Sequence, residues 1–311
     1  MSHDPDSHRR ALAGALRNQR VVEFVRETVR AGYLEVFSVP RAQIDALVDG
    51  AFDELARSRA ELEPKRLAET ASDLADRLFG KNDPSFWFSR AYHHYKTQTK
   101  PETDFQQLRE LISGKRVLDY GCGSGYLAAR LAHGGYQVVT TDVLDYRFDE
   151  ARQLPFVQMT SSSDIPFPDD SLDTALVQAV LHHVDPEVLP LVIQRLARIA
   201  EHVLIKEDSY GLPSGLPGLE EKLREQPLLR AFTEMPHELQ YRTLVLIDYF
   251  ANAIAQGISE MNMPFAFRTV TEWREVLEEN GLKLRRTLVA GFEPGRAHKS
   301  CHVWFACDRA A

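Results

Sequence analysis

A glycine turn is the part of this chain whose residue types and spacing point most directly to chemistry. It follows a short apolar run that ends in the acid Asp119, and its glycines stand at alternate positions: Gly121, Gly123 and Gly125. The next residues, 126–131, have the apolar spacing of a helix. Glycine lets a ligand approach the backbone closely, and a helix N-terminus offers unpaired N–H groups. A strand that passes through such a turn into a helix predicts a nucleotide site.

A second acid supports a nucleotide ligand. Asp142 closes the apolar stretch 136–141, and an acid at the end of the strand after a glycine turn commonly hydrogen-bonds ribose hydroxyls. Further along, Pro166 and Pro168 rule out a helix, so the residues before them form a loop. A fourth buried strand is expected at 172–177, and the segment 178–184 is the loop beyond it.

The elements that must position these residues alternate between strands and helices. Besides the strand before the turn, strands are expected at 136–141, 154–159, 172–177, 202–206, 284–290 and 301–307. A helix is expected at 185–200, and Thr269 with Glu272 has the spacing of a capping box at the start of another. This order predicts an α/β fold in its C-terminal two thirds.

The first hundred residues have helical patterns and no strand pattern. Helices are expected at 7–33, 41–57 and 64–79, with Gly80 ending the third. Their apolar stripes would pack on each other, on the main domain or on a second copy, which would make a homodimer. Residues 85–101 are rich in aromatic side chains and histidine. They form either a flap over a ligand or a segment that docks the helices.

Composition limits the class of protein. The chain has 311 residues, 44% of them hydrophobic, and a net charge of −8. That size allows one large domain or two modest ones, and the acidic balance argues against a general nucleic-acid binder. We expect no membrane span, because no apolar run is long enough, and no signal peptide, because the N-terminus is polar. The three cysteines cannot form a disulfide framework, so a reducing cytoplasm is expected.

Four segments resemble the class I S-adenosylmethionine-dependent methyltransferases, most clearly over residues 115–206. The matching motifs are LDYGCGSG (118–125), TTDV (140–143), SSDIPFPDDSLDTALVQAVLHHV (162–184) and HVLIKED (202–208). The resemblance implies a Rossmann-like, seven-stranded, mostly parallel sheet whose last strand is antiparallel. The helical patterns of the first hundred residues predict a helical cap at 1–100. Within the domain at 101–311, helical patterns at about 208–268 depart from a minimal core of this family and predict an inserted lid.

The resemblance implies that the cofactor is S-adenosylmethionine. The residues here that match the family's cofactor contacts are Asp119, Gly121, Gly123, Gly125, Asp142, Asp164, Ile165 and Gln178. The turn would lie against the methionine part, with Asp119 organising its amino-acid end. Asp142 would take the ribose hydroxyls, Asp164 and Ile165 would enclose the adenine, and Gln178 would lie near the methyl group.

Two other functions compete with this interpretation. A dinucleotide-binding oxidoreductase that uses NAD(P) would need a small residue at position 126, where this chain has Tyr126. Its fingerprint also does not call for an acid such as Asp119 before the glycines. A methyltransferase-like subunit without catalytic activity is the second alternative, and the intact motifs argue against it.

Methyl transfer is an in-line displacement, which needs a base only when the acceptor must lose a proton. The candidates lie after the fourth strand, after the fifth strand and in the aromatic segment: His182, His183, Glu207, Asp208 and Tyr92. The family often has a structural histidine at the place of His183. The alternative for Glu207 and Asp208 is a solvated strand end, and for the histidines near Tyr92 a place on the surface.

No cluster of cysteine or histidine has the spacing of a zinc site, and no resident metal is expected. Asp248 and Glu260 could pair with each other or coordinate a metal, but their spacing does not support a metal specifically. Glu293 and His298, in the last hairpin, are expected in solvent. The lid and the absence of a basic surface favour a small-molecule acceptor, apolar or aromatic, and one of specialised metabolism. Whether oxygen, nitrogen or carbon is methylated stays open.

Overall fold

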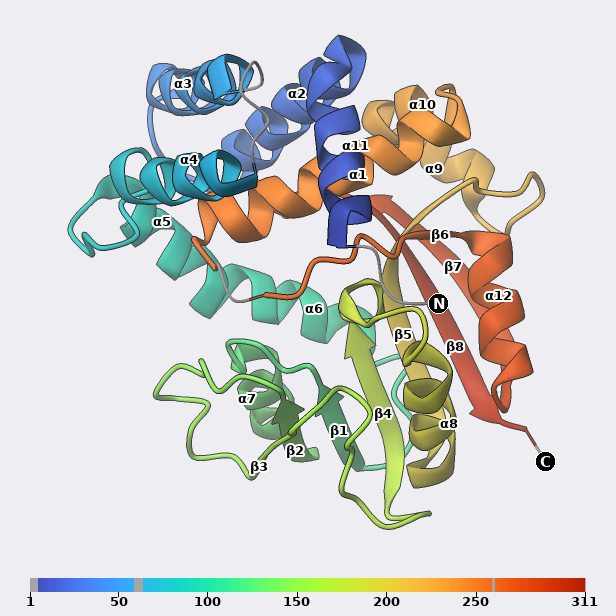
Figure 1. The fold of residues 1–311 in the computed structure, drawn as a ribbon. Helices are drawn as coiled ribbons and strands as arrows, with labels where there is room; N and C mark the ends of the chain where they lie inside the picture. The colour runs from blue at the N-terminus through green and yellow to red at the C-terminus, as the bar shows by residue number, and fades with distance from the viewer. Residues whose placement is uncertain (1–4, 59–63, 259–260, 311) are drawn as a thin grey trace. The chain divides into compact units, whose positions relative to one another are not determined.

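The computed structural model describes residues 5–58, 64–258 and 261–310 (Figure 1). The chain divides into two compact units, each assembled from three stretches of sequence. We call them the sheet unit and the helical unit. The sheet unit contains residues 96–222, 268–290 and 302–311, and the helical unit contains residues 1–95, 223–267 and 291–301.

The sheet unit is built on one mixed β-sheet. Its strands are β1 (Arg116–Tyr120), β2 (Gln137–Asp142), β3 (Phe156–Gln158), β4 (Leu172–Gln178), β5 (Ala200–Tyr210), β7 (Leu282–Phe292) and β8 (Cys301–Arg309). They lie in the order β3-β2-β1-β4-β5-β8-β7, and the short β6 (Arg268–Thr269) pairs with β5 outside this path. The strands from β3 to β5 are parallel, while β8 is antiparallel to β5. The predicted fold class is confirmed, and β6 is a small addition to it.

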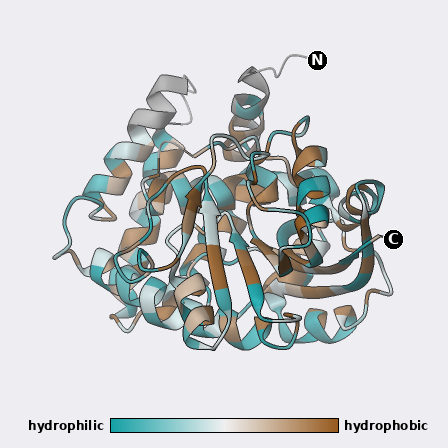
Figure 2. Cartoon of the chain, turned by 90° about the horizontal axis from the view of Figure 1, so that it is seen from below, coloured by the Kyte–Doolittle hydropathy of each residue, from teal (hydrophilic) through white to brown (hydrophobic). Residues whose placement is uncertain are grey.

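Helices cover both faces of this sheet because side chains alternate along each strand. In β1, Leu118 packs in a core with α8 (Leu189–Ile199) and α12 (Val270–Glu279). Its neighbour Val117 packs in a second core with α6 (Lys100–Leu108) and α7 (Tyr126–His133). The strands are correspondingly coloured as largely hydrophobic in Figure 2.

The largest boundary differences from the sequence predictions in the sheet unit concern β5 and α8. Strand β5 does not end at residue 206 but continues to Tyr210, because it pairs with β8 as far as Asp208 and with β6 at Ser209 and Tyr210. Glu207 and Asp208 therefore lie within a buried strand and are not a solvated strand end. Helix α8 begins at Leu189 and not at 185, after a turn in which the Val188 N–H donates to the Asp185 carbonyl. The capping box of α12 is confirmed.

The helical unit contains most of the helices. They are α1 (Pro5–Arg17), α2 (Gln19–Val36), α3 (Arg41–Ser58), α4 (Pro64–Arg77), α5 (Trp87–His94), α10 (Pro227–Thr233) and α11 (His237–Tyr249), and α9 (Leu219–Glu225) leads into it. The single helix predicted at 7–33 is two helices. The Asn18 side chain accepts a hydrogen bond from the Val21 N–H and begins α2 there.

Segments far apart in sequence form the helical unit's core. Helices α1 and α2 both contact α11 (Figure 1), and the apolar stripe of α2 is buried. The loop 293–300 packs on α2 at Gly32, where an added Cβ would lie 2.2 Å from the Ala297 carbonyl oxygen. Lys299 Nζ lies 2.7 Å from Glu35 Oε2. Because this packing occupies the stripe of α2, the stripe no longer argues for a homodimer by itself.

This loop was expected in solvent, and that prediction was wrong. Glu293 is buried, and His298 Nε2 lies 3.0 Å from the Tyr33 hydroxyl. Both side chains are held because the loop is packed between helices of the same unit. Among the described residues, no helix is long and apolar enough to cross a bilayer.

Candidate functional site

The glycine turn has a backbone that only glycine adopts at low cost. The φ angles of its three glycines are positive: +69° at Gly121, +53° at Gly123 and +74° at Gly125. Two of these positions also lack room for a side chain. A Cβ on Gly121 would lie 2.6 Å from the side chain of Val180, and one on Gly125 would lie 2.6 Å from Ala151 Cβ. The turn is therefore enclosed by the loop after β4 and by the segment after β2.

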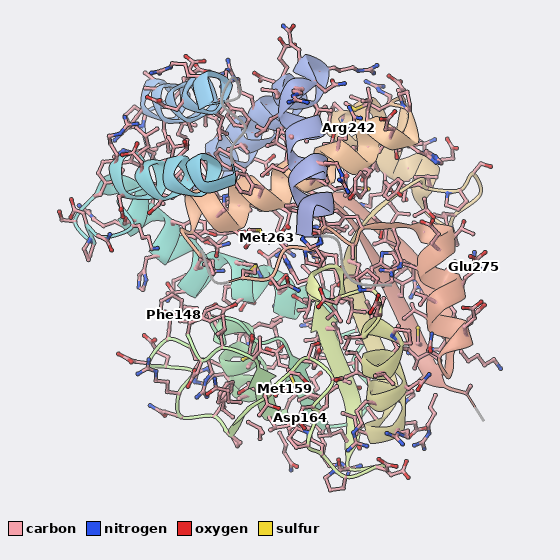
Figure 3. All side chains as sticks on the ribbon, in the orientation of Figure 1. Phe148, Met159, Asp164, Arg242, Met263 and Glu275 are labelled. Carbon is pink, nitrogen blue, oxygen red and sulfur yellow. The ribbon has the colours of Figure 1, made fainter. Side chains whose placement is uncertain are left out.

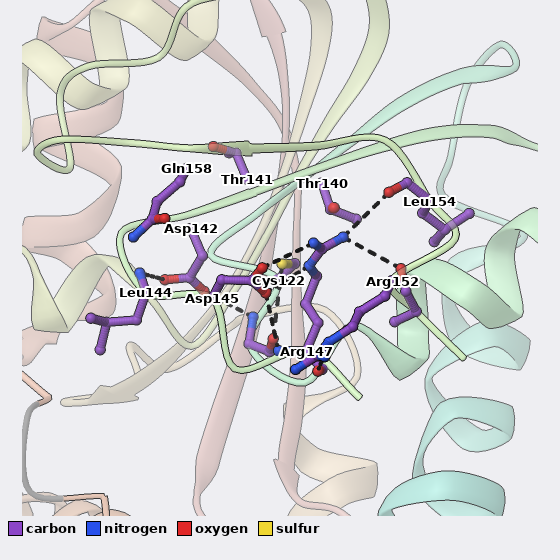
Figure 4. A network of polar contacts seen from close by, with 12 residues as sticks. Cys122, Thr140, Thr141, Asp142, Leu144, Asp145, Arg147, Arg152, Leu154 and Gln158 are labelled. Atoms are coloured by element: carbon purple, nitrogen blue, oxygen red, sulfur yellow. Dashed lines mark hydrogen bonds and ion pairs between the residues drawn. The ribbon is translucent and has the colours of Figure 1, made fainter. Parts of the chain in front are cut away.

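Asp142 ties the end of β2 to this turn. Its Oδ2 accepts a hydrogen bond from the Gly123 N–H at 2.9 Å. Its Oδ1 accepts one from the Leu144 N–H at 3.3 Å, which Figure 4 shows. The side chain is 8% exposed, and burial raises the pKa of its carboxyl. The position suits a ligand that lies across the turn, and its contact with ribose stays a prediction.

The segment after β2 is anchored by Arg147, which the sequence patterns did not single out. Its guanidinium pairs with both oxygens of Asp145, at 2.9 and 3.1 Å, and donates to the Leu154 carbonyl at 3.3 Å (Figure 4). It also lies 3.9 Å from the centre of the Phe156 ring. On the same segment, Phe148, labelled in Figure 3, packs its ring on Tyr126 at 4.5 Å. The spacing of Asp145 and Arg147 was the available local signal, whereas the Leu154 carbonyl and the Phe156 ring are placed by the fold.

Asp119 lies at the end of β1 on the face covered by α6 and α7, since it alternates with Leu118. Burial raises the pKa of its carboxyl to about 7, the nearby Lys100 works against this, and Asp142 and Asp104 add to it. Lys100 Nζ lies 2.7 Å from Asp104 Oδ2 on α6. The sequence analysis missed Lys100 and Asp104. Their spacing of four on a helix was the available signal.

Gln178 ends β4 beside β1. Its Nε2 is buried and has no hydrogen-bond partner among the described protein residues. A buried donor without a protein partner is rare, and it fits a polar ligand group at this place. Together with the closely packed glycines and the acids Asp119 and Asp142, Gln178 makes the carboxyl edge of the sheet suitable for a polar, cationic nucleoside.

In the loop before β4, Asp164 and Ile165 were expected to enclose the adenine, and the structure places them in different surroundings. Asp164 is exposed and accepts a hydrogen bond from the Thr160 hydroxyl at 2.7 Å; it is labelled in Figure 3. Ile165 is 2% exposed and packs in the core under α8 and α12. The hydroxyl of Tyr120 donates to the Ser162 carbonyl at 2.7 Å and holds the loop at the end of β1. The adenine contact of Asp164 and Ile165 stays a prediction.

Glu207 is the most enclosed of the proposed proton-transfer groups, with 0% of it exposed. Its Oε1 accepts hydrogen bonds from the N–H groups of Val180 and Leu181, at 3.0 and 2.7 Å. Its Oε2 lies 2.5 Å from His182 Nδ1. The sequence brought Glu207 and His182 forward separately, and the structure joins them.

Asp208 lies on the opposite face of β5 from Glu207. It pairs in register with His302 of β8, whose Nε2 is 3.4 Å from Asp208 Oδ1. His182 Nε2 is 3.9 Å from the other oxygen of Asp208. His183 is half-buried, and its ring centre lies 4.2 Å from that of His182. Three imidazoles and two carboxylates thus lie close together near the carboxyl end of β4.

Tyr92 and Asp248 belong to the helical unit. The ring of Tyr92 stacks on Phe88 at 5.5 Å, and burial raises its pKa well above the usual value, so it gives up its proton less readily. The neighbouring His93 is exposed. Asp248 Oδ1 accepts a hydrogen bond from Asn252 at 2.7 Å, while Glu260 lies outside the described residues.

Comparison with known families identifies the central part of the sheet unit. Residues 118–202 match a family model described as a methyltransferase domain. The match starts in β1 and ends in β5, so it contains the glycine turn, Asp142 and Gln178. The chain carries a class I S-adenosylmethionine-dependent methyltransferase domain. The mostly parallel sheet with its antiparallel β8 agrees with the fold that the sequence resemblance implies.

Individual proteins resemble parts of this chain. An uncharacterized methyltransferase of Mycobacterium bovis is 38% identical over 77 residues, which are 24% of this chain and 32% of that protein. The 27-O-demethylrifamycin SV methyltransferase of Amycolatopsis mediterranei is 26% identical over 125 residues, covering 36% of this chain and 46% of that protein. The matches with the curated relatives thus span from about a third to under half of their length.

Among solved structures, the chain resembles the Burkholderia thailandensis 1,6-didemethyltoxoflavin-N1-methyltransferase, determined with 1,6-didemethyltoxoflavin and S-adenosylhomocysteine. It is 14% identical, with a TM-score of 0.45, and the match covers 80% of this chain and 91% of that one.

Proposed function

We propose that this protein is an enzyme that transfers a methyl group from S-adenosylmethionine to a small-molecule acceptor. The observation that carries the proposal is the glycine turn. Within the matched methyltransferase domain, it is held in a positive-φ backbone, bonded to Asp142 and closed in by Val180. At the three glycine positions, this geometry leaves the backbone without a side chain to face a ligand.

The residues around the turn would bind and orient the cofactor. When bound, S-adenosylmethionine supplies a methyl group on a sulfonium. Asp119 would face the cationic amino-acid end, where its buried carboxylate interacts strongly with positive charge. Asp142 would accept from the ribose hydroxyls, and Gln178 Nε2 would donate to the methionine part. Orientation and exclusion of water would supply much of the rate.

Among the candidate bases, His182 is the one that the geometry favours. Glu207 uses both carboxylate oxygens on protein groups, and one of these contacts orients the His182 ring through Nδ1. Proton exchange with an acceptor would then use His182 Nε2, which lies 3.9 Å from Asp208. An acceptor that is already deprotonated would not need this group.

A small acceptor fits the charge of the chain and one of its relatives. The net charge of −8 does not favour a polyanionic nucleic-acid substrate. The Amycolatopsis relative is named for a small molecule, 27-O-demethylrifamycin SV. We extend that class to this chain as an apolar or aromatic metabolite, with the methylated atom left open.

Calorimetric titration tests the cofactor assignment. We expect S-adenosylmethionine and S-adenosylhomocysteine to bind with micromolar affinity, and NAD and NADP not to bind. Binding of NAD alone would contradict the proposal and favour the oxidoreductase. Transfer of labelled methyl to a panel of phenols, amines and polyketides then tests the acceptor class. Cofactor binding without transfer to any small molecule, but with transfer to RNA or protein, would refute that class.

A further inference from the structure

We propose that Glu207 is a positioning residue for the cofactor site, acting through the loop 179–182 on the glycine turn. The proposal rests on the proposed function only in the identity of the ligand. It assigns Glu207 no proton transfer and no direct contact with cofactor or acceptor.

The Glu207 carboxylate binds three consecutive residues of one loop. It accepts the N–H groups of Val180 and Leu181, and it pairs with the ring of His182 at 2.5 Å. Successive backbone N–H groups that converge on one anion are a strong arrangement in a buried place. The residue is fully buried and lies within β5, where it pairs with Val303 of β8 directly after the last pair between β4 and β5, Gln178 with Lys206. The carboxylate is therefore a fixed point to which the loop is attached.

The loop needs such an attachment because its first residue is strained. Ala179 has a φ of +52°, in the left-handed region that a residue with a Cβ rarely adopts. Its N–H donates to the Lys206 carbonyl at 2.7 Å, one residue before Glu207. A strained backbone persists only where its surroundings hold it. Here β5 holds it from two adjacent residues, Lys206 by its backbone and Glu207 by its side chain.

The strained loop places two groups of the candidate cofactor site. Val180 lies against Gly121, so closely that a Cβ on that glycine would be 2.6 Å away. Gln178, directly before the strained residue, presents the buried Nε2 that has no partner among the described residues. If the loop were released, Val180 and Gln178 could move away from the glycine turn. The cofactor would then bind less tightly, because these two groups would no longer be held in position.

The experiment compares Glu207→Ala and Glu207→Gln with Glu201→Gln as the matched control. Glu201 lies on the same strand but is exposed. The amide introduced by Glu207→Gln can still accept from both N–H groups through its one oxygen, whereas the methyl group of alanine cannot. We expect the Kd for S-adenosylmethionine to rise about 30-fold in Glu207→Ala, because two buried donors lose their acceptor, and about threefold in Glu207→Gln. The control should bind as the wild type does.

Amide hydrogen exchange gives a readout that needs no cofactor. In Glu207→Ala, the amides of Val180 and Leu181 should exchange at least about tenfold faster, while amides in the centre of β1 stay protected. A merely structural role would raise exchange throughout the sheet and lower the melting temperature without this local pattern.

Ala179→Gly separates the positioning role from other effects. Glycine adopts a positive φ without strain, so Glu207→Ala should cost severalfold less cofactor affinity in the Ala179→Gly background. Equal costs in both backgrounds, or wild-type affinity in Glu207→Ala, would overturn the proposal. A wild-type protein that does not bind S-adenosylmethionine would instead refute the proposed function, and the exchange experiment would still test the loop.

Discussion

The two units differ in what their buried polar groups do. At the carboxyl edge of the sheet unit, buried acids hold loops and turns: Asp142 binds the glycine turn, and Glu207 binds the loop after β4. In the helical unit, aromatic rings fill the core, and residues such as Lys299 and Glu35 fasten one distant segment to another. Buried polar groups therefore shape the candidate site in the sheet unit. In the helical unit, polar groups join three separate segments of the chain.

The comparison indicates which measurement should respond to damage in each unit. Distortion of the sheet unit's edge should change ligand affinity, since the strands beneath it are held by two hydrophobic cores. Distortion of the contacts between the three segments of the helical unit should lower its stability, because those contacts hold residues 1–95, 223–267 and 291–301 together.

Gly121→Ala should have the largest effect. The new Cβ would meet Val180 at 2.6 Å in a backbone with a φ of +69°, so the turn must move. We expect the Kd for S-adenosylmethionine to rise at least about 100-fold in calorimetry. Gly135→Ala is the control, because its φ is +87° but nothing lies within 4 Å of the added Cβ. It should lower stability by about 1 kcal/mol and leave affinity unchanged. If both substitutions weakened cofactor binding equally, the loss would come from backbone strain at a positive φ and not from the position of Gly121 in the site.

Gly32→Ala should mainly affect stability. An added Cβ would lie 2.2 Å from the Ala297 carbonyl oxygen, which forces the loop 293–300 away from α2. Overpacking of this kind costs about 1–3 kcal/mol of unfolding free energy, measured by denaturant titration. Gly50→Ala in α3 is the matched control, since its nearest neighbour, Leu78, would be at 3.7 Å. Alanine should stabilise that helix by up to about 1 kcal/mol. A loss of cofactor affinity in Gly32→Ala would contradict the prediction that damage to the helical unit changes stability and not ligand affinity.

Cofactor affinity should depend on the protonation of Asp119. With a pKa of about 7, this carboxyl is largely neutral below pH 7 and cannot attract the cofactor's ammonium. Affinity should therefore fall about tenfold for each pH unit below about 7, measured between about pH 5.5 and 7.5. Asp119→Asn should bind weakly without this dependence. A pH-independent wild type would exclude a charge interaction with Asp119.

The same raised pKa acts on stability with the opposite sign. Folded Asp119 keeps its proton up to about pH 7, whereas the unfolded carboxyl releases it near its ordinary value of 3.8. Its contribution to stability without cofactor is thus full at acidic pH and is lost as pH rises toward 7. The difference between wild type and Asp119→Asn in denaturant titrations should follow that trend.

Lys100→Ala should have the smallest effect. Lys100 lowers the pKa of Asp119 against burial, so its removal should move the midpoint of the affinity profile to higher pH, by less than about one unit. Lys115→Ala is a suitable control, because Lys115 lies over the Tyr136 ring and is not among the groups that affect Asp119. A midpoint that stays in place in Lys100→Ala would mean that solvent screens the pair.

Local patterns were sufficient for much of the sheet unit. Alternating and continuous apolar runs located the strands, and the glycines with Asp119 and Asp142 located the turn, because each signal lies within a few residues of chain. The same reasoning ended β5 at residue 206 and left a solvated strand end open for Glu207, because the pairing of β5 with β8 joins residues about one hundred positions apart. It missed Arg147 and Lys100, although each has an acidic partner within four residues of chain, Asp145 and Asp104, because neither pair belongs to a known motif.

What the sequence determined by itself is the methyltransferase domain and the position of its glycine turn, because steric limits on φ and the periodicity of strands and helices act locally. The tertiary structure decided which polar groups are buried together. It joined Glu207 to the loop after β4, put Ile165 into the core, and brought α2, α11 and the last loop into one unit. The physical reason is burial: a carboxylate without water must find donors, and only the packed fold determines which ones lie within reach.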